Sequence, residues 1–233
     1  MGITICGTEG LGYPTAELTW GLIVSLARKI SEENSSSRSG SWQTTLGIGL
    51  KGKTLGILGL GNLGSQVARI GNAFGMNVVS WSQNLTKSKA AENETTLVSF
   101  DELMEISDFL SIHTVLSDRT RNLIGMRELN LMKPTAFLVN TSRGPIVNED
   151  ALVQALREGV IAGAGLDVFD TEPLPYGHPF LNLSNTLITP HMGYVTIEGY
   201  KIFYSQTVEC IGQYLNCLLY TSDAADEGLG VDL

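Results

Sequence analysis

Short apolar runs alternate with amphipathic stretches along most of this chain. The apolar runs suit strands that are buried on both faces, and apolar residues three and four positions apart suit helices that cover a sheet. This alternation predicts a doubly wound parallel sheet of the α/β class with helices on both faces. The predicted strands are 55–58, 77–81, 108–113, 136–140, 161–167 and 186–188, and the predicted helices between them are 63–74, 100–106, 124–131 and 149–158.

Both ends of the chain extend this pattern. Residues 2–6 predict a short strand, which a glycine-rich turn connects to a helix that Pro14 opens. Arg28 and Lys29 suit the last turn of that helix, because cations there oppose the negative end of the helix dipole. Residues 31–41 are rich in serine and predict a solvated loop, whereas residues 196–215 predict a final helix.

Composition and charge narrow the class of protein. The 233 residues are 43% hydrophobic and include 26 glycines, which fits a packed α/β protein rather than a disordered one. A net charge of -9 without a basic cluster argues against binding to nucleic acid. No apolar run is long enough to span a membrane, and no signal peptide precedes the first strand-like run. The three cysteines, Cys6, Cys210 and Cys217, lack metal-site spacing, so we expect reduced thiols, a cytoplasmic protein and no metal site.

Residues 217–233 differ from the rest of the chain. Their sequence resembles the conceptual translation of a sequencing adapter, and the alternative is an ordinary acidic C-terminus. We interpret this segment as not native and predict no helix or strand in it. It carries no Lys or Arg and four acidic residues, so without it the net charge changes from -9 to -5; these residues are Asp223, Asp226, Glu227 and Asp232.

A glycine turn follows the predicted strand 55–58 and opens the helix 63–74. Gly59 permits a tight turn, Gly61 lets backbone amides approach a pyrophosphate, and Gly64 lets the helix pack closely on the strand. The helix N-terminus adds partial positive charge. Such a turn alone is weak evidence, because glycine turns often serve only as loops. The flanking strand and helix favour a Rossmann-type dinucleotide site.

The residue that usually selects between the two nicotinamide cofactors is not acidic here. Ser82 stands at the end of the second predicted strand, where an Asp or Glu would hold the ribose hydroxyls and repel a 2′-phosphate. Ser82 can bond a ribose but cannot exclude NADP by charge. Lys87 and Lys89 lie nearby and are interpreted as solvated surface. The cofactor is therefore NAD or NADP, with a slight preference for NAD.

Three polar residues each follow a different predicted strand. Arg143 can clamp a carboxylate, His191 can move a proton, and Glu172 can orient His191 and favour its charged form. Taken singly, a surface salt bridge is the more ordinary role for Arg143, and a structural role is the more ordinary one for a histidine. Because the carboxyl ends of parallel strands share one edge, we expect all three to meet there. Asp167 is a further candidate, for the nicotinamide carboxamide, or otherwise a turn cap.

These motifs together resemble the D-isomer-specific 2-hydroxyacid dehydrogenase family. The resemblance rests on residues 14–20, 59–64, 140–145, 164–169, 171–174 and 189–194, and it covers nearly everything from residue 2 to residue 215. It implies Arg143, Glu172 and His191 as catalytic residues. It implies cofactor contacts from Gly59, Gly61, Asn62, Leu63, Gly64, Ser82, Thr114, Thr141, Ser142, Asp167 and Gly193.

The resemblance also implies a domain organisation. Family members begin with roughly 100 further residues, a flavodoxin-like substrate domain of ordinary size. We therefore expect residues 1–13 to be a remnant of that domain, residues 14–195 to form the dinucleotide-binding domain, and residues 196–216 to return to the substrate domain. An N-terminally truncated fragment of this kind is expected to turn over substrate poorly.

The expected function is hydride transfer between a nicotinamide cofactor and a small 2-oxo or 2-hydroxy acid. The family implies a homodimer for the complete protein. A glyoxylate or hydroxypyruvate reductase is an alternative within the family. A cofactor-sensing binding protein is an alternative of another class, since related transcriptional corepressors share the fold, and an inert truncation product is a third.

Overall fold

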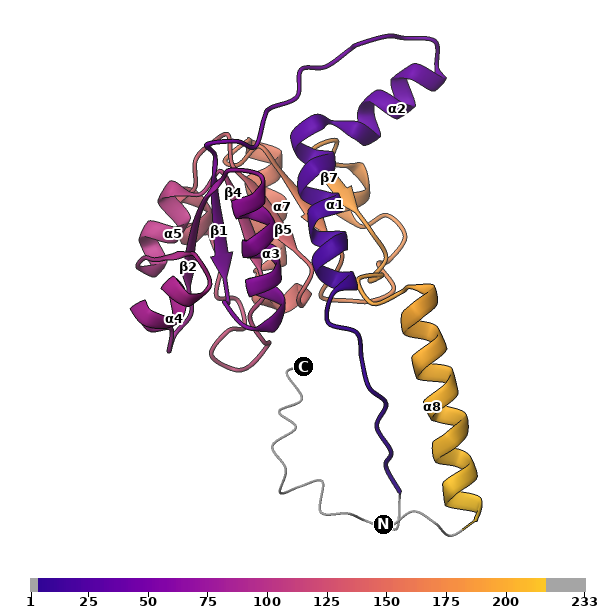
Figure 1. Cartoon of the computed structure of the whole chain (residues 1–233). Coiled ribbons are helices and arrows are strands. Elements are labelled where there is room, and N and C mark those ends of the chain that lie inside the picture. The colour runs from indigo at the N-terminus through magenta and orange to yellow at the C-terminus, as the bar shows by residue number, and fades with distance from the viewer. Residues whose placement is uncertain (1–3, 217–233) are drawn as a thin grey trace.

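Seven parallel strands form one sheet in a computed structural model that describes residues 4–216 (Figure 1). The strand order is β3-β2-β1-β4-β5-β6-β7, and every neighbouring pair is parallel. This arrangement confirms the predicted doubly wound α/β fold. The strands are β1 (Thr54–Leu58), β2 (Asn77–Trp81), β3 (Thr96–Leu97), β4 (Phe109–Ile112), β5 (Phe137–Asn140), β6 (Gly163–Leu166) and β7 (Thr186–Ile188).

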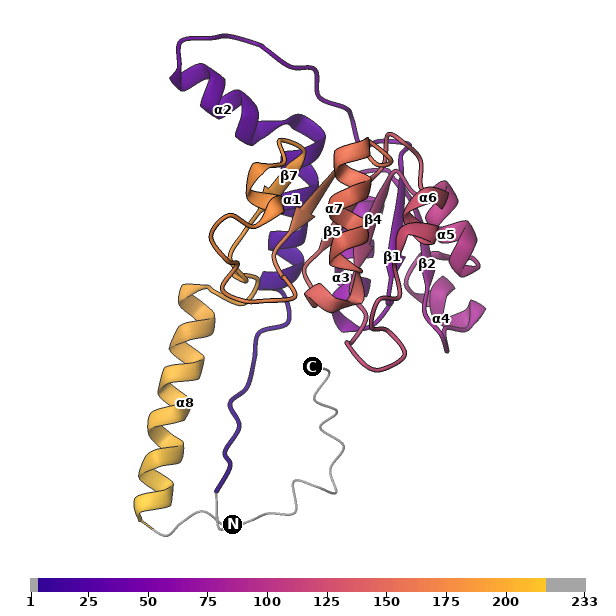
Figure 2. The ribbon, with the colours of Figure 1, turned by 180° about the vertical axis from the view of Figure 1, so that it is seen from behind.

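Helices cover the two faces of the sheet. On one face α1 (Pro14–Arg28) packs against β5 and β6, and α3 (Asn62–Ala73) packs against β1 and β2 (Figure 1). On the other face lie α5 (Phe100–Ile106), α6 (Met126–Leu131) and α7 (Glu149–Glu158), which are in front when the molecule is turned around (Figure 2). The sheet is therefore the middle of three layers.

Two apolar clusters, one on each face, hold these layers together. Consecutive residues of a strand point to opposite faces, so Phe109 joins the cluster under α1 and α3, whereas Leu110 joins the cluster under α5, α6 and α7. Leu138 and Val139 divide in the same way in β5. Because both faces are covered, the strands are apolar along their whole length, which explains the continuous apolar runs in the sequence.

The strand order places the glycine turn at the carboxyl edge of the sheet. From β1 the chain builds outward through β2 and β3, and it then returns to add β4 on the other side of β1. The crevice beyond the carboxyl ends of β1 and β4 is the place where open parallel sheets bind ligands.

The prediction of a loop over residues 31–41 was wrong for most of its length. Residues 30–38 form the helix α2 (Ile30–Arg38), which projects from the body of the molecule (Figure 1). Pairs along the helix stabilise it: Lys29 contacts Glu32 at 3.1 Å, and Arg38 donates to Asn34 at 3.2 Å. The serines are accommodated because their hydroxyls can bond the preceding turn, as Ser35 does to the carbonyl of residue 31 at 3.0 Å.

The predicted strand at residues 2–6 is also absent in its described part, residues 4–6. Residues 4–11 instead run beside α8 (Ile197–Leu215), and the backbone N–H of Glu9 donates to Gln206 at 2.6 Å (Figures 1 and 2). Within the part of the chain that the structure describes, no strand lies beside this segment to pair with it. Helix α8, which was predicted, extends away from the sheet and exposes apolar side chains; among them are Val208, Ile211 and Leu215. The segment 217–233, interpreted as foreign, lies outside the described residues, together with Cys217.

Two short elements were not predicted. Helix α4 (Lys87–Glu92) begins at Thr86, whose side chain accepts the N–H of Lys89, and β3 follows it at the sheet edge. The Thr86 cap was a usable signal, since threonine is a preferred N-cap residue. The other predicted helices and strands are confirmed with shifts of at most two residues at their ends; α6, for example, begins at Met126 rather than at Ile124.

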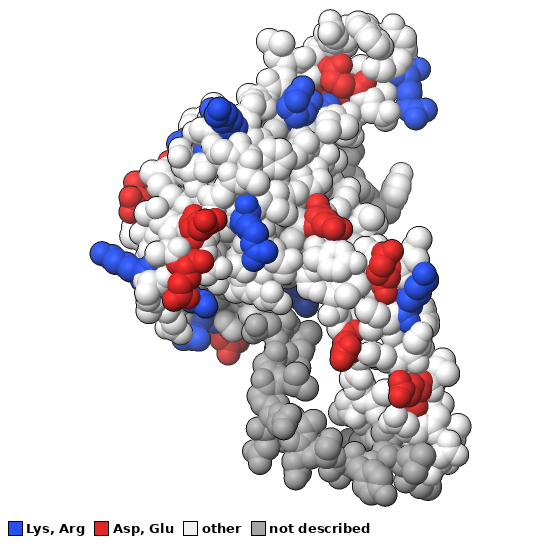
Figure 3. Space-filling view, viewed as in Figure 1, with Lys and Arg blue, Asp and Glu red and all other residues white. Residues whose placement is uncertain are grey.

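Charged side chains are scattered over the surface. On the face shown in Figure 3, Lys and Arg alternate with Asp and Glu, and neither sign forms a continuous patch. Among residues 4–216, no helix is both long and apolar enough to cross a membrane.

Candidate active site

A cavity of about 650 Å³ opens at the carboxyl edge of the sheet. Its walls come from the glycine turn after β1, the ends of β2 and β4, and the segments after β5, β6 and β7. Of the predicted site residues, Gly64 and Glu172 do not line this cavity. The others do: Gly59, Gly61, Asn62, Leu63, Ser82, Thr114, Thr141, Ser142, Arg143, Asp167, His191 and Gly193.

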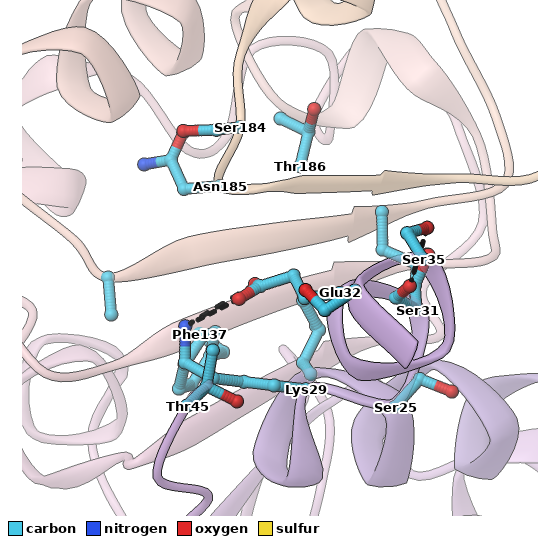
Figure 4. A pocket seen from close by; sticks show the side chains of 14 residues that line it. Ser25, Lys29, Ser31, Glu32, Ser35, Thr45, Phe137, Ser184, Asn185 and Thr186 are labelled. Carbon is cyan, nitrogen blue, oxygen red and sulfur yellow. Dashed lines mark hydrogen bonds and ion pairs between the residues drawn. The ribbon is translucent and has the colours of Figure 1, made fainter. Parts of the chain in front are cut away.

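A larger cavity of about 740 Å³ lies at the opposite end of the strands (Figure 4). It is bounded by α1, α2 and the first residues of β5 and β7, namely Phe137 and Thr186. Its charged residues Lys29 and Glu32 pair with each other. Parallel sheets bind ligands at the carboxyl ends of their strands, so the cavity at that edge is the candidate site despite its smaller volume.

The glycine turn has the geometry of a phosphate cradle. Gly59 has a φ of 99°, and a Cβ there would lie 2.7 Å from the backbone after β4. A Cβ on Gly64 would lie 2.0 Å from the carbonyl oxygen of Gly59, so α3 packs directly on the turn. A Cβ on Gly61 would meet no atom within 4 Å, and helix α3 has neither a capping side chain nor an acid in its first turn. The positive end of α3 is therefore available to an anion.

Ser82 follows the last residue of β2 and faces this turn. Its hydroxyl accepts the backbone N–H of Leu60 at 2.9 Å. The side chain is only partly buried and lines the cavity. An uncharged hydroxyl therefore occupies the position at which an acid would repel a 2′-phosphate.

His191 and Glu172 form a close pair at the edge of the cavity. Nδ1 of His191 lies 2.5 Å from one carboxylate oxygen of Glu172, and the other oxygen accepts the backbone N–H of Phe169 at 2.9 Å. Both side chains are about one-third exposed, at 36% and 34%. Because a carboxylate only accepts hydrogen bonds, Nδ1 carries the proton and Nε2 is the nitrogen left for other chemistry.

Asp167 takes the turn-cap role that the sequence left open, on the turn that carries His191. The residue is 1% exposed. One carboxylate oxygen accepts from the Thr189 hydroxyl at 2.6 Å and from the N–H of Met192 at 2.9 Å, and the other accepts from the N–H of Gly193 at 2.9 Å. The backbone N–H of His191 donates to the Asp167 carbonyl at 2.8 Å. Asp167 therefore holds His191, which has a left-handed φ of 50°, in place.

Asn140 organises the segment that carries Arg143. Its Oδ1 accepts the N–H of Ser142 at 3.0 Å, and its Nδ2 donates to the carbonyl of Arg143 at 2.9 Å. The Ser142 hydroxyl donates to the carbonyl of Thr114 at 2.6 Å, which ties this segment to the end of β4. Asn140 was not among the predicted site residues. The signal in the sequence was an Asn at the end of a strand, because an Asn side chain there often accepts a hydrogen bond from the backbone N–H two residues later.

Two further residues of the cavity wall make hydrogen bonds of their own. The Thr141 hydroxyl is buried against that of Thr19 on α1 at 2.8 Å. His113 bonds the Ser111 hydroxyl through Nε2 at 2.8 Å, and burial lowers the pKa of His113 to about 4. This histidine is therefore neutral at physiological pH, and sequence reasoning had not singled it out. Within residues 4–216, no group of three or more His, Cys, Asp and Glu side chains is arranged to hold a metal ion.

Comparison with known proteins identifies the family. The model of the D-isomer specific 2-hydroxyacid dehydrogenase NAD-binding domain matches residues 20–193. The chain belongs to this family. The glyoxylate reductase of Aeropyrum pernix is 47% identical over 208 residues, which are 85% of this chain and 62% of that protein.

Solved structures of the family agree with this assignment. A phosphoglycerate oxidoreductase from Vibrio cholerae superimposes with a TM-score of 0.88 at 34% identity, over 93% of this chain and 70% of that one. A D-lactate dehydrogenase from Aquifex aeolicus, complexed with NAD and lactic acid, gives a TM-score of 0.79 at 29% identity, over 89% of this chain and 68% of that one. The chain spans about 62% of the length of the A. pernix relative.

Proposed function

We propose that this chain provides the cofactor site and the proton-transfer group of an NAD(P)-dependent 2-hydroxyacid dehydrogenase. The observation that carries the proposal is the His191–Glu172 pair at 2.5 Å, placed at the same sheet edge as Arg143 and the glycine turn. The substrate would be a small 2-oxo acid in one direction and a 2-hydroxy acid in the other.

Each polar group has a distinct task in this proposal. Arg143 binds the substrate carboxylate, since its guanidinium presents a rigid fork of donors. Nε2 of His191 donates a proton to the carbonyl oxygen during reduction and accepts it during oxidation. The Glu172 carboxylate accepts from Nδ1 of His191 and so fixes the orientation and the tautomer of the imidazole. A bound nicotinamide cofactor would supply the hydride for the carbonyl carbon.

The residues around the glycine turn fit a dinucleotide. The open space beside Gly61 and the uncapped positive end of α3 suit a pyrophosphate, which Asn62 and Leu63 would contact from the first turn. Ser82 would hydrogen-bond the adenosine ribose. Because residue 82 is a serine rather than an Asp or Glu, the site can accept either NAD or NADP. We retain the slight preference for NAD.

Glyoxylate or hydroxypyruvate is the substrate pair that we favour within this class. The support is that the A. pernix relative is named glyoxylate reductase, as is one from Thermococcus litoralis at 44% identity. The selectivity for the group attached to the 2-oxo acid would depend largely on a substrate domain.

We also propose how the chain is organised and assembled. The family model ends at residue 193, which supports residues 14–195 as the cofactor domain and residues 1–13 and 196–216 as parts of a second lobe.

A homodimer is supported by the arm between α2 and β1, where Trp42 is 81% and Leu46 92% exposed. A cytoplasmic location is supported by Cys6 and Cys210, which are free thiols.

A single-turnover assay tests the function. The chain at high concentration would be mixed with NADH or NADPH and glyoxylate, and cofactor oxidation would be followed by absorbance. We expect His191→Ala and Arg143→Ala to lower the rate by about 10²–10⁴-fold with cofactor affinity preserved. Asp118→Ala, an exposed acid, is the control. An unchanged rate in His191→Ala would remove that residue from the mechanism, and cofactor binding without turnover by the complete protein, substrate domain included, would favour the cofactor-sensing alternative.

A further inference from the structure

The segment that carries Glu172 rests directly on the segment that carries Arg143. A Cβ built on Gly144, in the turn η1 (Gly144–Ile146), would lie 2.1 Å from the carbonyl carbon of Phe169 and 2.6 Å from the nitrogen of Asp170. Only a glycine permits this approach of two backbones. The peptide between Phe169 and Asp170 is therefore a shared contact of both segments.

The two consecutive peptide groups on either side of Phe169 are both hydrogen-bonded. The N–H of Phe169 donates to Glu172 at 2.9 Å, and the N–H of Asp170 donates to Oε2 of Glu149 at 3.3 Å. Glu149 is the first residue of α7, a rigid element of the domain. The backbone that orients Glu172 is thus anchored to a helix outside the cavity.

His178 completes this arrangement. Its Nε2 faces Oε1 of Glu149 at 3.0 Å, and its Nδ1 accepts the N–H of Phe180, in the turn η2 (Pro179–Asn182), at 3.3 Å. These two bonds assign the proton to Nε2, which donates to the carboxylate. The His178 side chain is 13% exposed and that of Glu149 is 23% exposed, so both are largely shielded from water.

We infer that Glu149 and His178 are a positioning pair that keeps Glu172 facing His191. Glu149 holds the 169–170 peptide on α7, and His178 holds the Glu149 carboxylate in the orientation that accepts from Asp170. The inference rests on the proposed function for its importance in catalysis, but the arrangement itself is independent of turnover. Neither residue lines the cavity, so neither is assigned a contact with substrate or cofactor.

The charges around the pair explain why a histidine is useful there. Burial raises the pKa of Asp170, and the neighbouring carboxylates of Glu149 and Asp150 raise it further, whereas Arg121 and His178 lower it. Three acidic groups therefore converge at this corner of the domain. The hydrogen bond from His178 engages Oε1 of Glu149 and leaves Oε2 to accept the Asp170 N–H.

The tautomer of His191 is a direct readout of its contact with Glu172. An imidazole that donates from Nδ1 to a carboxylate is held as the Nδ1–H tautomer, whereas an imidazole without that partner populates both tautomers. The chain contains only three histidines, and ring ¹⁵N chemical shifts distinguish the two tautomers. The spectra of the 233-residue chain in alkaline buffer would be assigned with His113→Asn, His178→Gln and His191→Asn.

We expect Nδ1–H for His191 and Nε2–H for His178 in the unaltered chain. Glu149→Ala should remove most of the Nδ1–H preference of His191, and Glu149→Gln, which keeps one acceptor oxygen, should restore part of it. Asp150→Ala is the matched control, because it removes an exposed acid from the same turn of α7. A circular dichroism spectrum of each variant shows that the fold is kept, and Glu149→Gln serves as the test if Glu149→Ala unfolds.

Two outcomes would overturn the inference. One is a His191 spectrum in Glu149→Ala and Glu149→Gln that matches the spectrum of Asp150→Ala. The other is an unaltered chain in which His191 shows no Nδ1–H preference, because Glu172 would then not hold it. Both outcomes are read without cofactor or substrate. Failure of the proposed function would appear instead as an absence of turnover with the His191 tautomer intact.

Discussion

Asp167 accepts the backbone N–H of Gly193 at 2.9 Å, so the acid at the end of β6 fixes the chain two residues beyond His191. Its other carboxylate oxygen accepts from Thr189 and Met192. One buried side chain therefore bonds both sides of the histidine. The orientation of His191 is set by two carboxylates, with Asp167 acting on its backbone and Glu172 on its ring.

Replacing Asp167 with Asn should destabilise the domain. The Asn side chain has one acceptor oxygen, so at least one buried N–H or hydroxyl would face an NH₂ group and lose its partner. An unpaired buried donor costs about 1–3 kcal/mol, and urea denaturation would measure this loss in the free energy of unfolding. Asp118→Asn, at an exposed acid, is the control. Equal stabilities of the two variants would contradict the role assigned to Asp167.

The partly buried His113 should make the stability of the domain depend on pH. Burial depresses the pKa of His113 from its ordinary value of 6.5 to about 4, so between these values the unfolded chain binds a proton that the folded chain does not. The stabilising contribution is complete above pH 6.5 and is lost as the pH falls toward 4. Each pKa unit corresponds to about 1.4 kcal/mol, so the loss amounts to at most about 3.5 kcal/mol.

His113→Asn is the variant that isolates this effect. Other groups also titrate in this range, so the quantity to compare is the slope of unfolding free energy against pH, not its absolute value. We expect a shallower slope in His113→Asn between pH 4 and 6.5, measured by urea denaturation at several pH values. Parallel curves for the two proteins would show that His113 takes up its proton equally in the folded and unfolded states.

The sheet and the shared edge of the site could be predicted because they follow from periodicity and topology. Arg143, Glu172 and His191 each follow an apolar strand, and parallel strands bring such positions to one edge. The bonds of Asp167 could not be predicted, because they depend on the path of the backbone after β7. Helix α2 was missed because serines predict turns unless their hydroxyls bond their own helix, as Ser35 does.

Ser82→Asp should shift cofactor preference toward NAD. The Ser82 hydroxyl lies against the glycine turn, where it accepts the N–H of Leu60 at 2.9 Å. An Asp there would keep an acceptor, add hydrogen bonds to the ribose hydroxyls and repel a 2′-phosphate. Fluorescence titrations with NADH and NADPH would give the ratio of the two dissociation constants before and after the change. A constant ratio would mean that residue 82 does not face the adenosine ribose.

Two glycines of the same turn should respond in opposite ways to alanine. A Cβ on Gly64 would lie 2.0 Å from the carbonyl oxygen of Gly59, and backbone cannot give way as a flexible side chain can, so Gly64→Ala should lower stability by about 1–3 kcal/mol. A Cβ on Gly61 meets no atom within 4 Å and projects from the wall of the cavity, so Gly61→Ala should leave stability unchanged. It should weaken NADH binding at least about tenfold, or about 1.4 kcal/mol, by occupying the space for the pyrophosphate.

Urea denaturation and NADH fluorescence on both variants check this. Unaltered NADH affinity in Gly61→Ala would place the pyrophosphate elsewhere, and unaltered stability in Gly64→Ala would refute the close packing of α3 on the turn.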